Sequence, residues 1–249
     1  MRSKIVICIP TELESRQKIA SALLNKYGTD YLFLGRNFRH TATNQSCEIQ
    51  ICTRPCNDYL EQSNLDLAKA IELAGQDKIS DVTLNKISRH QQLVYLISHR
   101  VGYDACRVMA RFVGVFLNIG GIAVNVESAQ IAYEADRWLD RANSSDVFDT
   151  YCLFVGLVEA EDIYYSVGMH NFGKADVAIA ITTDIGLAIY VMNVFNYYRL
   201  TESPILQDGH TFQPDIESPK FTMKLIEDNE YPIDSFQFNP YGRWMLTRC

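Results

Sequence analysis

The sequence predicts an α+β protein made of two tandem ferredoxin-like β-α-β-β-α-β units that pack as one pseudo-duplicated domain. Three observations lead to this prediction. The 249 residues are 47% hydrophobic and 21% charged, the balance of a globular chain with a core of its own. Runs of strand type and of helix type alternate along the chain. Their order is the same before and after Gly120-Gly121, so we expect an N-terminal half over 1–118 and a C-terminal half over 119–249, with the helices gathered on one side.

The first strand is expected over 4–10. Its residues are apolar without interruption until a proline ends the run, which is typical of a central strand buried on both faces. The spacing of Thr11 and Glu14 is that of a capping box and predicts a helix from there to Gly28. Leu24 is expected on the inner face of this helix.

The clearest helix is expected over 103–118, at the end of the first half. One broad face of it is apolar and carries Phe112 and Phe116, which we expect in the core. The other elements expected before it are a hairpin of strands over 31–38 and 47–54 around the polar turn 41–44, a helix over 57–75, a short helix over 82–87 and a strand over 93–97.

The C-terminal half repeats the element order of the first half without repeating its residues. Asp184 is expected to cap a long apolar helix over 185–200. The other elements expected here are a strand over 122–126, a helix over 128–142, strands over 152–158 and 163–169, and a strand over 221–226.

The net charge indicates which kind of partner the protein binds, and the cysteines indicate in which cellular compartment it resides. The net charge of -7 is unfavourable for a nucleic-acid surface and favours a basic or neutral protein partner. Seven cysteines without a C-x-x-C motif indicate reduced, unpaired thiols in the cytosol. Cys47 and Cys52 point to opposite faces of a strand, so a zinc site with Cys56 is not expected, and neither is another metal or cofactor.

The apolar segments are too short or too interrupted for export or for a membrane span. The N-terminal run over 5–9 is shorter than a signal-peptide core. The longest apolar segment, over 108–124, contains Arg111 and Asn118. We therefore expect a cytoplasmic protein that does not enter the membrane.

The motifs of the common enzyme classes are missing from the sequence. The candidates for a functional site are therefore polar residues at the ends of predicted strands and helices. The chain has no G-x-S-x-G, no P-loop, no G-x-G-x-x-G after the first strand and no H-E-x-x-H. The candidate functional residues all follow strand-like or helical runs of the second half, and they are Glu127, Ser128, His170, Asn171, Asp208 and His210.

Each of these candidates has a structural interpretation beside the functional one. Glu127 and Ser128 fit a strand end followed by a helix N-cap, and Asp208-Gly209 fits a hairpin turn. His170, between two glycines, fits a satisfied histidine at a strand end. The functional interpretation has Glu127, His170, Asp208 and His210 converge, because carboxylates and imidazoles serve as metal ligands and as acid and base groups.

At these same positions the sequence resembles the bacterial proteins that carry domain of unknown function 4261. The segments that carry the resemblance are 164–173 (YYSVGMHNFG), 126–129 (VESA), 208–212 (DGHTF) and 239–244 (NPYGRW). The resemblance covers most of the chain and is strongest from Leu93 onward. Gln130 departs from it, since a small residue is expected there.

The resemblance implies a cytosolic bacterial protein without an established activity, from a family with members encoded near toxin and immunity genes. The leading hypothesis is therefore a non-catalytic protein-binding protein, such as an immunity protein that occludes a basic toxin domain. The alternative is a small hydrolase or metal-dependent enzyme that uses Glu127, His170, Asp208 and His210. A structural module would give none of these residues a special role.

Overall fold

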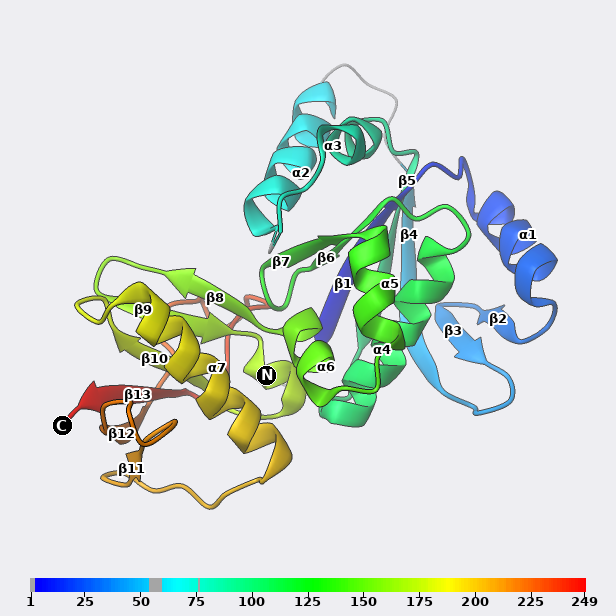
Figure 1. Cartoon of the computed structure of the whole chain (residues 1–249). Coiled ribbons are helices and arrows are strands. Elements are labelled where there is room, and N and C mark those ends of the chain that lie inside the picture. The colour runs from blue at the N-terminus through cyan, green and yellow to red at the C-terminus, as the bar shows by residue number, and fades with distance from the viewer. Residues whose placement is uncertain (1–2, 54–59, 76) are drawn as a thin grey trace.

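The computed structural model describes residues 3–53, 60–75 and 77–249 and places them in two β-sheets with helices around them (Figure 1). The first sheet has the strand order β2-β3-β4-β5-β1-β6-β7, and the second has the order β11-β12-β13-β10-β9-β8. The elements are β1 (Ile5–Thr11), α1 (Arg16–Tyr27), β2 (Tyr31–Leu34), β3 (Asn37–His40), β4 (Ser46–Thr53), α2 (Leu60–Ala74), α3 (Asp81–Ser88), β5 (Gln92–Ser98), α4 (Tyr103–Leu117), β6 (Ala123–Val126), β7 (Ile131–Glu134), α5 (Ala135–Asn143), α6 (Val147–Phe154), β8 (Gly156–Glu159), β9 (Ile163–Val167), the 3-10 helix η1 (Met169–Phe172), β10 (Asp176–Ala180), α7 (Ile185–Thr201), β11 (Thr211–Phe212), β12 (Phe221–Ile226) and β13 (Arg243–Arg248).

Strand β1 lies inside the first sheet, and all of its residues are buried, as its apolar run predicts. Every neighbouring pair in this sheet is antiparallel. Ile7 stands opposite Leu96 of β5 and Val126 of β6, and these three side chains belong to one hydrophobic cluster. The α+β class is thus confirmed, with an antiparallel sheet at its centre.

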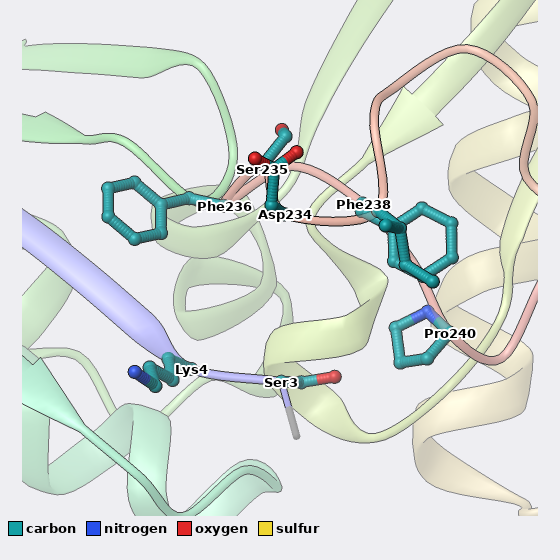
Figure 2. A pocket seen from close by; sticks show the side chains of 8 residues that line it. Ser3, Lys4, Asp234, Ser235, Phe236, Phe238 and Pro240 are labelled. Carbon is teal, nitrogen blue, oxygen red and sulfur yellow. The ribbon is translucent and has the colours of Figure 1, made fainter. Parts of the chain in front are cut away.

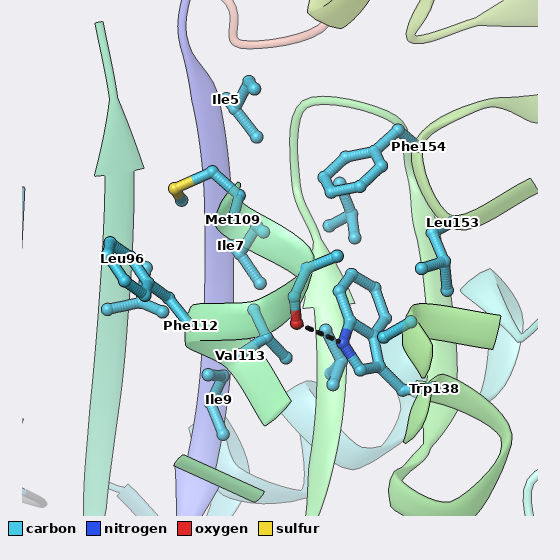
Figure 3. Close-up of a cluster of buried hydrophobic side chains, with 14 of the residues drawn as sticks. Ile5, Ile7, Ile9, Leu96, Met109, Phe112, Val113, Trp138, Leu153 and Phe154 are labelled. Carbon is cyan, nitrogen blue, oxygen red and sulfur yellow. Dashed lines mark hydrogen bonds between the residues drawn. The ribbon is translucent and has the colours of Figure 1, made fainter. Parts of the chain in front are cut away.

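The main core lies between the first sheet and the helices α1, α4, α5 and α6. Figure 3 shows Phe112 and Val113 of α4 over the isoleucines of β1, with Trp138 of α5 beside them. The indole nitrogen Nε1 of Trp138 donates a 3.2 Å hydrogen bond to the Ala110 carbonyl oxygen, so the ring is buried without an unpaired donor. Phe112 and Phe116 are each 2% exposed, which confirms that this helix face is core.

The opposite face of the first sheet is covered at its β7 end by α2 and α3. Ala123 of β6 and Ala132 of β7 point to this side, and their small side chains belong to the same cluster as Ile71 of α2 and Ile87 of α3. The expectation that the helices gather on one side is therefore wrong. Because side chains alternate along β6 and β7, small apolar residues lie on the face of the sheet opposite the main core. Helices α2 and α3 pack against these residues and form a second helical layer.

The second sheet is mixed, because β10 and β13 run parallel while the other neighbouring pairs are antiparallel. Helix α7 packs on it through Val191 and Phe195, against Val177 of β10 and Trp244 of β13. The α7 helix and its Asp184 cap are confirmed, since the Asp184 carboxylate accepts a 3.0 Å hydrogen bond from the Leu187 backbone nitrogen. Strands β10, β11 and β13 were not predicted.

The tandem ferredoxin-like duplication is not confirmed. In a ferredoxin-like unit the first strand lies between the third and the fourth strand, whereas here β1 lies between β5 and β6 and does not pair with β4. The first sheet also continues past residue 118 into β6 and β7. The second half begins β6-β7-α5-α6-β8 in place of the expected β-α-β-β-α-β order.

The helix expected over 128–142 begins only at Ala135, and residues 131–134 form strand β7. The reason is the turn before it: Gln130 has φ of +52°, a left-handed conformation that interrupts a helix and closes the β6–β7 hairpin. The strand expected over 152–158 is also wrong in its first part. Cys152 lies in α6, and the strand β8 begins at Gly156.

Two turns in the first half differ from the expectations. The run over 31–38 is split by Gly35, with φ of +66°, into β2 and β3, so this region forms two hairpins. The capping box is wrong: Thr11 ends β1 and its hydroxyl donates a 2.8 Å hydrogen bond to the Gly120 carbonyl oxygen, while Ser15 caps α1. Leu24 is 58% exposed and does not face the core.

The described cysteines are free thiols, as the sequence predicts for them, and they are Cys8, Cys47, Cys52, Cys106, Cys152 and Cys249. Cys56 and the expected start of the 57–75 helix lie outside the described residues. Among the helices that the structure describes, none combines the length and the apolar character needed to cross a membrane.

Candidate functional site

Three of the four polar segments singled out in the sequence meet at one place. They are the β6–β7 turn over 127–130, the η1 helix with its flanking glycines over 168–173, and the loop over 228–242. A side chain at 168 would not fit, because the residue has φ of +113° and a Cβ there would stand 2.2 Å from the Phe154 carbonyl oxygen and 2.8 Å from Ala129 Cβ. Gly168 thus lets η1 pack directly on the β6–β7 turn.

Glu127 and Ser128 form the side of this junction that faces the first sheet. Ser128 is fully buried, and its backbone nitrogen and its hydroxyl bind the backbone of Val6 at 3.5 and 3.4 Å. The Glu127 carbonyl oxygen accepts a 2.7 Å hydrogen bond from Nε2 of Gln237, which ties the turn to the 228–242 loop. The Glu127 side chain is half-buried, and this burial raises its pKa.

His170 is fully buried in η1. Neither ring nitrogen has a hydrogen-bond partner of good geometry among the described residues, although the Phe236 backbone lies close enough to favour the protonated form weakly. Burial dominates and lowers the pKa of His170 to about 4. His170 is therefore a neutral core residue at physiological pH, with no access to a substrate.

Asn171 serves the packing of η1 against α4 and α6. Its side-chain nitrogen donates a 3.0 Å hydrogen bond to the Phe154 carbonyl oxygen at the end of α6. Its own carbonyl oxygen accepts a 2.8 Å bond from the Gly102 nitrogen, one residue before α4. Its backbone and its side chain thus link two helices across the main core.

Asp208 and His210 lie apart from this junction, exposed in the turn before β11. The Asp208 carboxylate accepts a 2.8 Å hydrogen bond from the Leu225 backbone nitrogen, which is the role of a turn residue. Strand β11 is an edge strand, and β12, β13 and β10 separate it from β9, which leads into η1. The structure therefore does not bring Glu127, His170, Asp208 and His210 into one cavity.

Asp176, which sequence reasoning missed, is the polar centre of the junction. Its carboxylate accepts hydrogen bonds from Ser166 Oγ at 3.0 Å, from the Met169 nitrogen at 3.1 Å and from Asn239 Nδ2 at 2.5 Å. The residue is 3% exposed, and burial raises its pKa to about 6 despite these donors. The signal in the sequence is a single carboxylate at the start of the apolar run 175–181.

A buried ion pair fixes the 228–242 loop at both ends. Asp228 accepts a 2.9 Å hydrogen bond from the Arg243 guanidinium and a 2.8 Å bond from the Asn239 nitrogen, and the side chains of the ion pair are 2% and 4% exposed. The guanidinium also lies 4.4 Å from the centre of the Tyr165 ring. Both ends of the loop are thereby held in one buried polar cluster.

Between these anchors the loop presents an apolar loop surface, which consists of Ile233, Phe236, Phe238 and Tyr241. Ile233 and Phe236 are 65% and 47% exposed. A pocket of about 180 Å³ lies between this part of the loop and the start of β1, with Ser3 and Lys4 on its other side (Figure 2). A wider concavity of about 700 Å³ is also lined by Ile233 and Phe238, so the two hollows are neighbours on the loop.

In the described part of the chain, no group of three or more His, Cys, Asp or Glu side chains is arranged to hold a metal ion. Asp176 and His170 are 3% and 0% exposed, and neither lines the two hollows beside the loop. The apolar loop surface is one exposed part of the junction.

Comparisons with models of known protein families, with curated proteins and with solved structures gave no match to this chain.

Proposed function

We propose that this chain is a cytosolic protein that binds a basic protein partner through the apolar loop surface and has no turnover of its own. The observation that carries the proposal is the exposure of large apolar side chains on a loop whose two ends are fixed by buried hydrogen bonds. Exposed aromatic and aliphatic side chains gathered on one surface are typical of protein-binding sites.

The charge of the loop supports a basic partner. Residues 227–241 contain four carboxylates and no lysine or arginine. Arg243 pairs with both Asp228 and Glu230, so Glu227 and Asp234 remain as the unpaired carboxylates that flank the apolar side chains. An acidic rim around an apolar centre attracts a partner with the opposite charge and speeds its association.

The anchoring of the loop supports tight binding without rearrangement. Asn239 is 1% exposed and joins Asp176 of β10 to Asp228 at the start of the loop. A loop held in one conformation before binding loses little conformational entropy when the partner arrives.

We further propose that the partner is a basic toxin domain and that the chain acts as its immunity protein. This finer proposal rests on the resemblance to proteins with domain of unknown function 4261. An immunity protein of this kind covers the functional surface of the toxin, which requires an exposed binding face and no chemistry.

The test compares two double variants of the full-length protein. Ile233→Ser with Phe236→Ser removes the two most exposed members of the apolar loop surface. Ile205→Ser with Ile216→Ser is the matched control, since these isoleucines are 87% and 94% exposed outside the loop. Partners captured with the wild-type chain are purified, and each complex is reconstituted and measured by calorimetry.

We expect the control variant to bind like wild type and the loop variant to bind about 100-fold more weakly, as for the loss of two central apolar anchors. Association with the purified partner should slow as salt rises. Equal binding by both double variants would overturn the assignment of the surface. If no captured protein binds the purified chain, the binding function itself is wrong.

A further inference from the structure

A groove of about 640 Å³ lies beside the 228–242 loop, where Gln237 forms part of its lining. The end of helix α2 and the strand β8 form its walls, and the β6–β7 hairpin forms its floor. The lining residues that matter for its chemistry are Leu73, Asn125, Glu127, Gln130, Leu157 and Glu159.

The alternation of β6 places the polar floor of this groove. Val124 and Val126 face the main core, so Asn125 and the following Glu127 face the other side of the sheet. The Glu127 carboxylate is half-buried, and none of the described residues donates a hydrogen bond to it or pairs with it. A carboxylate in this position gains free energy from a cationic hydrogen-bond donor that enters the groove.

The rest of the lining selects the kind of cation. Glu159 adds a second carboxylate, and Asn125 offers an amide oxygen between the walls. Leu73 and Leu157 form apolar walls that fit a methylene chain. Among the described residues no lysine or arginine lines the groove. Two carboxylates and an amide oxygen beside apolar walls suit a guanidinium, which carries five hydrogen-bond donors on a three-carbon stem.

We infer that the groove binds an arginine side chain of the basic partner, with the guanidinium at Glu127 and the stem between Leu73 and Leu157. This inference rests on the proposed function and adds a specificity site to it. The arginine would enter beside the apolar loop surface. Gln237 lines the groove, and its two neighbours in the sequence, Phe236 and Phe238, belong to the apolar loop surface.

The test uses a small probe, so it does not need the partner. Nα-acetyl-arginine methylamide is titrated into the ¹⁵N-labelled protein, and its neutral isostere Nα-acetyl-citrulline methylamide serves as the control ligand. We expect saturable shifts of the Asn125 side-chain amide and of the backbone amides of Glu127 and Leu157. The citrulline compound should bind at least about 10-fold more weakly, the usual loss when a charged hydrogen bond becomes neutral.

Variants separate the groove from general effects of charge. Glu127→Gln should remove the preference for arginine over citrulline, while Glu202→Gln, an exposed carboxylate at the end of α7, should keep it. Leu73→Arg places a cation at the mouth from a side chain that is 78% exposed, and it should block the probe in a folded protein. Equal affinities for the two compounds in the wild type, or shifts outside the groove, would overturn the inference.

The two proposals fail in different ways. The Ile233→Ser with Phe236→Ser variant should still bind the arginine probe, because neither residue lines the groove. A wild-type protein that binds its partner through the loop but shows no arginine preference retains the proposed function and loses the groove. A protein that binds the arginine probe but no protein partner would retain the groove as an arginine site and lose the proposed function.

Discussion

The side-chain amide of Asn239 donates a hydrogen bond to the buried carboxylate of Asp176, a residue 63 positions earlier in the chain. The same amide nitrogen binds the Lys174 carbonyl oxygen at 3.0 Å, and the backbone nitrogen of Asn239 binds Asp228. One asparagine therefore fixes the 228–242 loop to the segment between η1 and β10. The stability of the proposed binding surface depends on this cluster.

Asp228→Ala should destabilise the protein by about 3 kcal/mol, because it leaves the Arg243 guanidinium buried with only Glu230 beside it. Chemical denaturation measures the change, and hydrogen exchange should show faster opening of residues 229–241. The matched control is Arg36→Ala, which removes a pair with Glu48 in which the arginine side chain is 73% exposed, and it should cost about 1 kcal/mol or less. Similar losses in the two variants would mean that the buried pair does not hold the loop.

The buried His170 should make the protein less stable as the pH falls from about 6.5 to about 4. Its pKa in the folded state is lowered to about 4, so the unfolded chain takes up a proton in this range and the folded chain does not. The wild type should lose about 3 kcal/mol relative to His170→Gln between pH 7 and pH 4. A difference that stays constant with pH would show that the ring is hydrated or paired.

Asp176 acts in the opposite direction over an overlapping range. Its pKa in the folded state is raised to about 6, so its contribution to stability is full below about pH 3.8 and is lost as the pH rises through 6. The pH dependence of the wild type alone is thus the difference of two effects. The comparison with His170→Gln, and separately with Asp176→Asn, resolves them in urea unfolding curves measured at each pH.

Gly168→Ala should be far more harmful than Gly209→Ala, although both glycines have positive φ. An added Cβ at 168 meets the Phe154 carbonyl oxygen at 2.2 Å, while at 209 it meets nothing within 4 Å. We expect about 1 kcal/mol of backbone strain at 209 and more than about 4 kcal/mol at 168. Thermal unfolding of the two variants measures the difference, and equal melting temperatures would contradict the close packing of η1 on the β6–β7 turn.

Phe112→Ala should destabilise the protein by about 3–5 kcal/mol. The ring is 2% exposed and lies edge-on to Phe38 with the ring centres 5.1 Å apart, so its removal leaves a cavity in the main core. Leu24→Ala on the exposed side of α1 is the control and should cost less than about 1 kcal/mol. The urea midpoint gives both values, and a midpoint that barely moves for Phe112→Ala would place α4 outside the core.

The elements that the sequence predicts well are those whose burial is carried by apolar side chains alone. Strands β1 and β5 and helix α4 belong to this group. Strands β10 and β13 were missed because each begins with a charged residue, Asp176 or Arg243, which is usually a surface feature. Asn239 is 63 residues from Asp176 and Asp228 is 15 residues from Arg243, so neither partner lies within the strand that it satisfies.

For the candidate site, the sequence predicts which segments are unusual but not the backbone conformation that connects them. The sequence singles out the two glycines that flank His170 and the segments 126–129 and 239–244, and the structure brings these segments together. The helix expected after Ser128 had the right apolar spacing, since Ile131 and Ala135 fit one helical face. The left-handed conformation of Gln130 ends the possibility of a helix there, and Ile131 begins a strand instead. The spacing of apolar residues does not reveal such a backbone conformation.

Strand β13 is the last element in chain order, and yet it lies inside the second sheet, between β12 and β10. During synthesis, β10 and β12 therefore leave the ribosome before the strand that joins them exists, and each has an open edge until residues 243–248 follow. A nascent chain that stalls or is cut before residue 243 would expose one open edge on β10 and one on β12. These two edges are therefore the places where an incomplete chain is most open to pairing with another chain.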